Sequence, residues 1–237
     1  MQAIRLIEMA LWGCLDMGKQ SKVHAFTKRG KVFGNVWRVY SAKCDQDFSL
    51  SSDRELAHWI LFLEFNPDVI RFDLNPQSRS QSPEPGAKRT ILDAEVIVRG
   101  GAIEWHEIKE GSFDKDAEST PQIELQRELA KAAGVKYRIF NDDDFAPKAS
   151  SIMPLLKVAA CLAAGRHFFI PPAINLDVAD YFIGHASGTL GEYLRHLNNH
   201  SQDALLYLFC QHYSLGKIAV EFESAFFAKN TKWTLVS

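Results

Sequence analysis

Two strand-like segments joined by Arg99-Gly100-Gly101 constrain this 237-residue chain more than any other part of its sequence. Residues 89–98 and 102–110 are rich in Ile, Val and alternating charged side chains, which is typical of strands. A connection that contains two glycines between such segments predicts a β-hairpin. We therefore expect the fold to be organised around this hairpin.

The segments on either side of the hairpin predict a compact α/β core. In chain order the elements are helix, strand, hairpin, helix and strand. They comprise a helix from Ser52 to about Asn66, a strand over 69–74, a loop over 75–87, a helix over 120–133 and a strand over 135–140. Ser52 and Glu55 have the spacing of a capping box, and Gly134 provides a stop for the second helix.

The composition is that of a globular protein, with 46% hydrophobic and 24% charged residues. The net charge of −2 excludes binding to nucleic acid through a bulk positive charge. The four cysteines form no C-x-x-C pair, which favours reduced thiols over a disulfide framework or a zinc ribbon. The apolar stretch over 152–165 is broken by Lys157 and is too short to span a bilayer, so we expect a cytoplasmic protein.

Residues 1–50 are predicted to form a basic N-terminal segment, with eight cationic and four acidic side chains. Within it, residues 22–43 mix Lys and Arg with four aromatic residues, a pattern that suits a phosphate backbone and stacked bases. A solvated basic surface with a few anchoring aromatic side chains explains the same pattern. Both interpretations stay open.

Residues 148–237 differ in character from the preceding core. Helices are predicted over 151–164, 187–197 and 201–213, followed by short strands over 218–222, 225–228 and 233–236. Helices followed by a small sheet are the outline of a winged helix. We therefore expect a winged-helix-like domain that binds a partner or DNA, while residues 50–145 carry the chemistry.

Asp93, Glu107 and Lys109 are the candidate site of the hairpin. Side chains two residues apart on a strand share a face, so Glu107 and Lys109 point the same way. With Asp93 on the neighbouring strand, two carboxylates and an ammonium converge on one point. Such hard oxygen donors suit Mg²⁺, with Mn²⁺ as a substitute, and a metal-assisted attack on a phosphodiester. Lys109 can orient or deprotonate the attacking water, or neutralise charge at phosphorus.

Other charged residues nearby have alternative explanations. Glu55 on the preceding helix can add a third carboxylate, and it can also cap that helix. Three further carboxylates lie nearby in sequence, and any of them can occupy a position of the site that is assigned here to a different residue: Glu95, Glu104 and Glu110. His106 falls on the opposite face from Glu107 and is expected to be a packing or surface histidine. Asp142-Asp143-Asp144 is expected to be a solvated turn or a helix start.

A helical Glu, a strand Asp and then Glu-x-Lys on the paired strand, followed by helix and strand, resembles the PD-(D/E)xK nuclease core. More narrowly, the chain resembles the TnsA endonuclease family of heteromeric DNA transposases over about residues 28–145, and by outline beyond them. The segments that carry this resemblance are Gly30–Lys43, Ser52–Leu56, Leu61–Val69, Asn75-Pro76, Leu92-Asp93, Glu107–Lys109, Tyr137–Phe145 and Asp203–Leu208.

The resemblance implies a restriction-endonuclease-like core over residues 51–147 and a winged-helix-like domain over residues 148–237. It implies Mg²⁺ at Glu55, Asp93 and Glu107, with Lys109 as the catalytic lysine. It also implies an endonuclease that nicks transposon ends on the strand that the transposase does not join. The implied partners are DNA, a retroviral-integrase-like transposase and an AAA+ ATPase regulator.

Two positions depart from the family pattern. Asn75 stands where members often have Gln, and Glu107 stands where they often have a different residue. Two alternative functions remain open: a stand-alone PD-(D/E)xK nuclease in defence or repair, and a DNA-binding winged helix fused to a scaffold that no longer cuts. The presence of Glu55, Asp93, Glu107 and Lys109 argues against the second of these.

Overall fold

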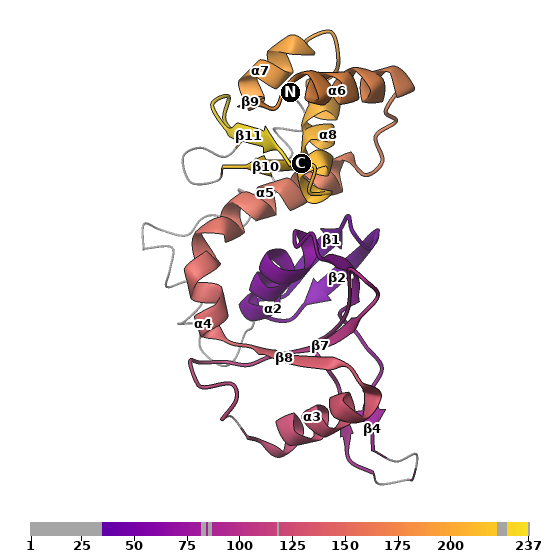
Figure 1. Cartoon of the computed structure of the whole chain (residues 1–237), viewed down its shortest axis with the longest axis vertical. Helices are drawn as coiled ribbons and strands as arrows, with labels where there is room; N and C mark the ends of the chain where they lie inside the picture. Colours follow the sequence, from indigo (N-terminus) through magenta and orange to yellow (C-terminus); the bar gives the residue numbers. More distant parts are fainter. Residues whose placement is uncertain (1–34, 82–83, 85–86, 118, 222–226, 237) are drawn as a thin grey trace. The chain divides into compact units, whose positions relative to one another are not determined.

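The structure is a computed structural model that describes residues 35–236 except 82–83, 85–86, 118 and 222–226. These residues divide into two compact units. Residues 35–39 and 43–150 form one, called here the sheet unit, and residues 40–42 and 151–236 form the C-terminal unit. Figure 1 labels their helices and strands. The chain is an α/β protein, as the order of its predicted elements indicates.

A four-stranded sheet of order β3-β6-β7-β8 forms the centre of the sheet unit. Its strands are β3 (Val69–Asp73), β6 (Ala94–Val98), β7 (Ile103–Ile108) and β8 (Lys136–Phe140). The β3–β6 and β6–β7 pairs are antiparallel, whereas β7 and β8 are parallel. Gly100 and Gly101 connect β6 to β7 at φ of 89° and 82°, a conformation that glycine adopts without strain. The predicted hairpin is confirmed.

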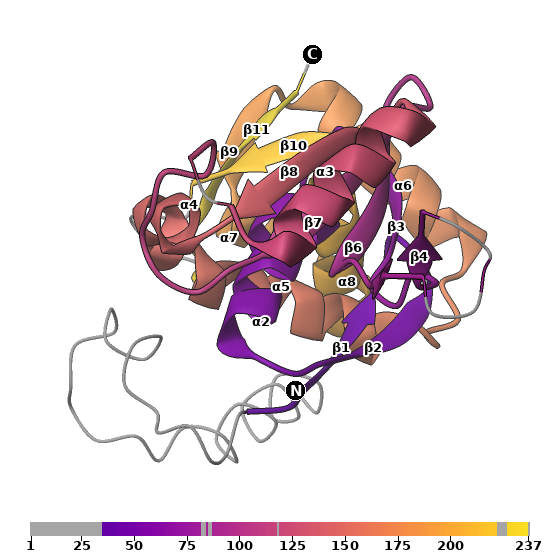
Figure 2. The same ribbon diagram turned by 90° about the horizontal axis from the view of Figure 1, so that it is seen from below.

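Helices lie on both faces of this sheet (Figures 1 and 2). One face carries α2 (Asp53–His58), which continues as η2 (Trp59–Glu64) with the wider π-type hydrogen bonding. The other face carries α3 (Pro121–Ala133), which Figure 2 shows lying over β7 and β8. The short helices α4 (Asp142–Phe145) and η3 (Ala146–Lys148) follow β8. The sheet is therefore a central layer between two helical layers.

Local signals in the sequence explain where these helices begin and end. The Ser52 hydroxyl accepts a hydrogen bond from the Glu55 N–H (3.1 Å), which caps α2. The Thr120 hydroxyl caps α3 in the same way, and Gly134 ends that helix in the left-handed conformation at φ 67°. Leu92, Trp105 and Ala130 then form an apolar core between α3 and the sheet. Both predicted helices of this unit are confirmed.

Two segments that precede β6 in the chain differ from expectation. The strand predicted over 89–98 is split, because β5 (Arg89–Thr90) pairs instead with β4 (Arg79–Ser80) in the segment predicted as loop. The residues predicted only as a basic segment contain a hairpin of β1 (Trp37–Ser41) and β2 (Gln46–Leu50). In β2 only Phe48 and Leu50 are buried, so its alternating pattern is too short to stand out from a polar segment.

The C-terminal unit combines helices with a small antiparallel sheet of order β10-β11-β9. In chain order its elements are α5 (Ala149–Gly165), α6 (Pro172–Gly184), β9 (Ser187–Thr189), α7 (Leu190–His196), α8 (Gln202–Ser214), β10 (Ile218–Val220) and β11 (Lys232–Leu235). Large aromatic side chains from several of these elements are buried together: Tyr181, Phe182, Tyr193, Phe209 and Trp233. Ring contacts such as Phe182 with Trp233 (4.9 Å between centroids) hold the elements to one another.

Helix α6 is the largest element of the C-terminal unit that the sequence analysis misses. The sequence analysis predicts no helix over these residues, but proline is well tolerated in the first turn of a helix, and α6 begins at Pro172. Residues 187–189 are a strand rather than the start of a helix, because Thr189 is the N-cap of α7. Of the strand predicted over 225–228, residues 225–226 lie outside the described residues, and Phe227 and Ala228 are not in a strand.

Elements α4, η3 and α5 join into a helical run of 24 residues from Asp142 to Gly165. By length and composition alone this run is able to cross a membrane, and 39% of its most apolar window is buried within the protein. The core helix of a soluble protein passes the same test. The run is therefore only weak support for a membrane segment, and the cytoplasmic location stays a prediction.

Candidate functional site

Asp93 and Glu107 lie opposite each other on neighbouring strands. The β6–β7 register pairs Ala94 with His106, so the next residue pair outward is Asp93 with Glu107. The Asp93 N–H donates to the His106 carbonyl (3.1 Å), and the Ile108 N–H donates to Asp93 Oδ2 (2.5 Å). The two carboxylates therefore share one face at one end of the sheet, which is the α3 face.

Lys109 follows directly after β7 and joins this pair. Its Nζ lies 2.7 Å from Glu107 Oε1, and its backbone N–H donates to the Phe140 carbonyl of β8 (2.8 Å). The same Nζ also donates to Gln122 Oε1 on α3 (3.2 Å). The structure thus brings Asp93, Glu107 and Lys109 together, with the ammonium at the carboxylate of Glu107.

Glu107 is only 3% exposed and is held by hydrogen bonds from α3. Gln122 Nε2 donates to Oε1 (3.0 Å), and Gln126 Nε2 donates to Oε2 (2.8 Å). Gln126 is fully buried, and its own carbonyl oxygen accepts from the Tyr137 hydroxyl (2.6 Å). Because a buried carboxylate is costly without partners, these donors make the burial of Glu107 possible.

The Asp93 carboxyl has the most perturbed electrostatic environment of the candidate site. Its pKa is raised to about 7, chiefly by burial and then by the neighbouring Glu107 and Glu55 carboxylates, while the Ile108 N–H and Lys109 act in the opposite direction. Interaction of Asp93 with all three of the other candidate residues indicates that they belong to one electrostatic cluster. A strongly shifted group of this kind is typical of functional sites, although structural networks also produce such shifts.

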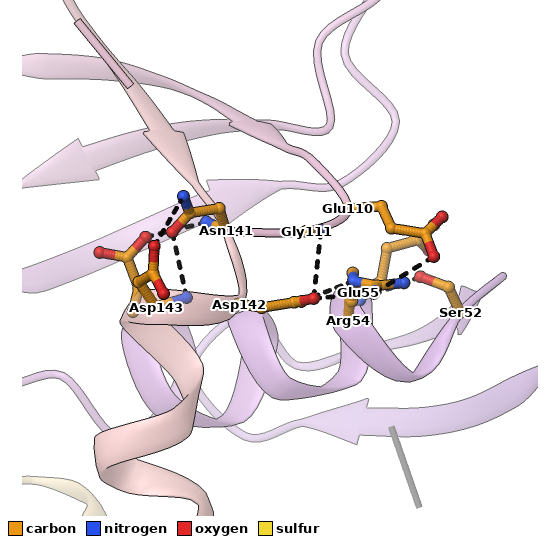
Figure 3. Close-up of polar contacts among 9 residues, drawn as sticks. Ser52, Arg54, Glu55, Glu110, Gly111, Asn141, Asp142 and Asp143 are labelled. Carbon is orange, nitrogen blue, oxygen red and sulfur yellow. Dashed lines mark hydrogen bonds and ion pairs between the residues drawn. The ribbon is translucent and has the colours of Figure 1, made fainter. Parts of the chain in front are cut away.

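Glu55 lies on α2 near this cluster, but its carboxylate is engaged elsewhere. Its two oxygens accept from the Ser51 N–H (2.6 Å) and the Ser51 hydroxyl (2.5 Å). The neighbouring Arg54 forms a two-point ion pair with Asp142 (2.7 and 3.0 Å), which also accepts from the Gly111 N–H (3.1 Å; Figure 3). The Glu55 carboxylate therefore contacts Ser51, the residue before the N-cap, rather than the Ser52 N–H that a capping box requires.

The remaining carboxylates of the hairpin have structural partners. Glu104 accepts from His106 (3.1 Å), Lys136 (3.0 Å) and Arg138 (3.1 Å), and these partners, His106 first, lower the pKa of Glu104. Glu95 pairs with Arg79 and accepts from the Trp105 indole N–H (2.9 Å).

A buried histidine pair lies on the α2 face of the sheet, opposite to Glu107. His58 Nε2 and His106 Nδ1 are 3.0 Å apart, and burial lowers the pKa of both imidazoles. Because Nε2 of neutral His106 donates to Glu104, its Nδ1 is the acceptor for His58. A cavity of about 500 Å³ adjoins His106, lined also by Arg99, Lys136 and Arg138, at the other ends of the strands from Asp93. The cavity is therefore distinct from the carboxylate cluster.

In the part of the chain that the structure describes, no three His, Cys, Asp or Glu side chains are close enough together to hold a metal ion as they are placed. The donor set nevertheless suits a hard divalent cation at Asp93 and Glu107. Burial is the main cause of the raised pKa of Asp93, and repulsion by Glu107 adds to it; a bound cation would offset both, and carboxylate oxygens are its preferred ligands. Glu55 has to leave Ser51 before it can join them.

Most of the basic N-terminal segment lies outside the described residues. Of its described members, Lys43 donates its Nζ to the carbonyls of Leu63 (2.8 Å) and Asn66 (2.6 Å), and burial lowers its pKa to about 8. The Trp37 indole N–H donates to Asp53 Oδ1 (2.8 Å). These two side chains therefore serve packing and helix termination, which favours the structural explanation for this end of the segment.

Sequence reasoning misses the two glutamines that support Glu107. Gln126 occupies a buried position of α3 together with Ile123 and Ala130, where an apolar residue is expected. The sequence signal for Gln126 is a polar residue at an otherwise apolar position of the helix that follows the Glu-x-Lys strand.

A scan against models of known protein families finds none that matches this chain, and a search of curated proteins finds no match either.

Proposed function

We propose that this protein is a metal-dependent DNA endonuclease that hydrolyses phosphodiester bonds. The observation that carries the proposal is the cluster of Asp93, Glu107 and Lys109 at one end of the sheet, with the pKa of Asp93 raised to about 7. Two carboxylates and an ammonium at one point are the groups that metal-assisted phosphoryl chemistry needs.

The arrangement of the sheet unit supports the finer assignment to a PD-(D/E)xK core. The resemblance implies a helical Glu, a strand Asp and Glu-x-Lys on the paired strand, followed by a helix and a strand. Helix α2, strands β6 and β7, α3 and β8 follow one another in that order. In the C-terminal unit, the order α6-β9-α7-α8-β10-β11 and the sheet order β10-β11-β9 support a winged-helix-like domain.

The residues of the cluster have separable roles in the proposed reaction. Asp93 and Glu107 would hold Mg²⁺ or Mn²⁺, and Glu55 would be a third ligand if its carboxylate were released from Ser51. When bound, the ion supplies Lewis-acid chemistry toward water and phosphate oxygens. Lys109 keeps its ammonium beside Glu107 and stabilises the negative charge that develops on the phosphoryl group under attack. Gln122 and Gln126 hold the two carboxylate oxygens of Glu107 in place by hydrogen bonds.

The biological setting that we propose is the nicking of transposon ends, as the resemblance to the TnsA family implies. The partners are then a transposase and an AAA+ ATPase regulator. Helix α8 contains no Lys or Arg, its buried Cys210 contacts Cys161 of α5, and the ring of its half-buried Tyr207 contacts Phe168. A helix that reads DNA needs exposed polar and cationic side chains, so this favours a protein partner for the C-terminal unit.

The first test is a nicking assay on DNA with Mg²⁺ or Mn²⁺. Asp93→Ala and Lys109→Ala should each lower the rate at least about 1,000-fold, because each removes a group of the reacting cluster. Lys131→Ala is the matched control, since this exposed lysine on α3 lies outside the cluster. Cleavage that continues in excess chelator would exclude the metal mechanism.

A stand-alone nuclease of defence or repair is the second candidate function. The same cluster supports both functions, so the difference lies in the partners. Co-purification of the full chain with the transposase and the ATPase encoded beside it would support transposition. Neighbouring genes that encode neither, together with cleavage by the chain alone, would support the second candidate.

A further inference from the structure

Two glutamines of α3 contact the Glu107–Lys109 pair from one side. The Gln122 carboxamide bridges the pair, because its Nε2 donates to Glu107 Oε1 (3.0 Å) while its Oε1 accepts from Lys109 Nζ (3.2 Å). One turn further along α3, Gln126 Nε2 donates to Glu107 Oε2 (2.8 Å). Both oxygens of Glu107 are therefore held by α3.

The orientation of each carboxamide follows from its partners. A lysine ammonium only donates and a carboxylate only accepts, so Gln122 can satisfy both with a single orientation. Gln126 is oriented by the Tyr137 hydroxyl of β8, which donates to its Oε1 (2.6 Å). Its Nε2 is also within reach of Thr90 Oγ1 (3.0 Å). The Tyr137–Gln126–Glu107 chain is therefore a directed set of hydrogen bonds that ends at the candidate site.

The cost of burying Gln126 argues that this chain does more than fill space. The side chain is fully buried at a position of α3 where a methionine or leucine fills a similar volume and needs no hydrogen-bond partners. What only a carboxamide provides there is a donor for the carboxylate of Glu107. In metal sites, such supporting groups orient the ligands and tune their affinity.

We propose that Gln122 and Gln126 are positioning residues of the candidate site, which hold Glu107 in the orientation for a divalent cation and set its spacing to Lys109. This inference rests on the proposed function. Gln126 orients Oε2 of Glu107, and Tyr137 orients Gln126. Gln122 couples the carboxylate to the ammonium.

The test measures Mn²⁺ binding by calorimetry and nicking by kinetics in the full chain. Gln126→Met and Gln122→Met should each weaken Mn²⁺ binding about 10- to 100-fold and lower kcat while KM for DNA stays unchanged, because the ligand is misaligned and the DNA contacts are kept. Tyr137→Phe should give a smaller loss in the same direction. The matched control is Gln81→Met, which alters an exposed glutamine that contacts Glu128.

Thermal unfolding of each variant separates a loss of positioning from a loss of fold. If Gln126→Met does not fold, the exposed position of Gln122 makes Gln122→Met the deciding variant. Wild-type Mn²⁺ affinity in folded glutamine variants would overturn the inference and leave the proposed function in place. A wild-type protein that neither binds Mn²⁺ nor nicks DNA would overturn both.

Discussion

The two units of this protein bury different kinds of side chain. In the sheet unit the buried set includes the carboxylates of Glu64, Glu104 and Glu107 and the imidazoles of His58 and His106. Among the described residues of the C-terminal unit, the buried side chains are apolar and aromatic apart from Ser41 and Thr231. The core of the sheet unit therefore contains charged side chains, whereas the core of the C-terminal unit is mainly apolar and aromatic.

This difference bears on where the proposed chemistry lies. An apolar and aromatic core stabilises a fold by removing surface from water and needs no further partner. Buried charges cost free energy unless each has a partner, and Asp93 keeps part of that cost as a raised pKa. We infer that the sheet unit loses some folding stability at the proposed reactive cluster, whereas the C-terminal unit has no such cost among its described residues.

The largest expected effect on folding is in the aromatic core of the C-terminal unit. Trp233 is 1% exposed and packs against Phe182 at 4.9 Å between ring centroids. Trp233→Ala should lower the free energy of unfolding by about 3–5 kcal/mol, because it leaves a cavity among rings. Urea denaturation measures this loss, with the exposed Leu176→Ala as control. A loss below about 1 kcal/mol would mean that this core is not the main source of stability of the unit.

A substitution that removes the charge of Asp93 is expected to raise the free energy of unfolding, whereas Trp233→Ala lowers it. The folded-state pKa of Asp93 of about 7 lies above that of an unfolded aspartate, so the folded protein binds a proton that the unfolded chain releases between about pH 4 and pH 7. The free energy of unfolding therefore falls as the pH rises through this window. Asp93→Asn stays neutral and should be more stable than the wild type by about 1–3 kcal/mol at pH 8, with little difference at pH 4.

Urea denaturation in chelator at pH 4 and pH 8 measures the effect at Asp93. Asp116→Asn, at an exposed aspartate of the same unit, is the control. A variant at Asp93 that is less stable than the wild type at pH 8 would show that the carboxylate stabilises the fold, against the comparison drawn above.

A smaller loss is expected at the ion pair between Arg54 of α2 and Asp142 of α4. Hydrogen bonds from Arg54 lower the pKa of Asp142, so the pair stabilises the fold above the pKa of an unfolded aspartate. This contribution disappears as the pH falls through the lowered folded-state pKa. Asp142→Asn should cost about 1–2 kcal/mol at pH 7, and the cost should shrink below about pH 4.

Thermal unfolding over a pH series measures the cost at Asp142. The neighbouring Asp143→Asn is the matched control, because the Asp143 carboxylate is exposed and has only a 3.5 Å contact with Asn141. An equal cost at pH 3 and pH 7 would mean that the effect does not come from the charge of Asp142.

The sequence by itself determines the hairpin, the two capped helices and the strand over 136–140. These elements depend on local signals: glycines with positive φ at the turn, Ser52 and Thr120 as N-caps, and Gly134 as a stop. The shared face of Glu107 and Lys109 also follows from the chain alone, because strand side chains alternate. Local geometry fixes such features within a few residues.

Only the tertiary structure decides which groups surround Glu107 and where Glu55 points. Gln122 and Gln126 contact Glu107 across 15 and 19 residues of chain, and the Ser51 contacts of Glu55 compete with any role at the site. Helix α6 and the β1–β2 hairpin likewise depend on burial against distant residues rather than on a strong local pattern. Hydrogen bonds and packing between distant segments carry no local signal, because they depend on how the whole chain folds.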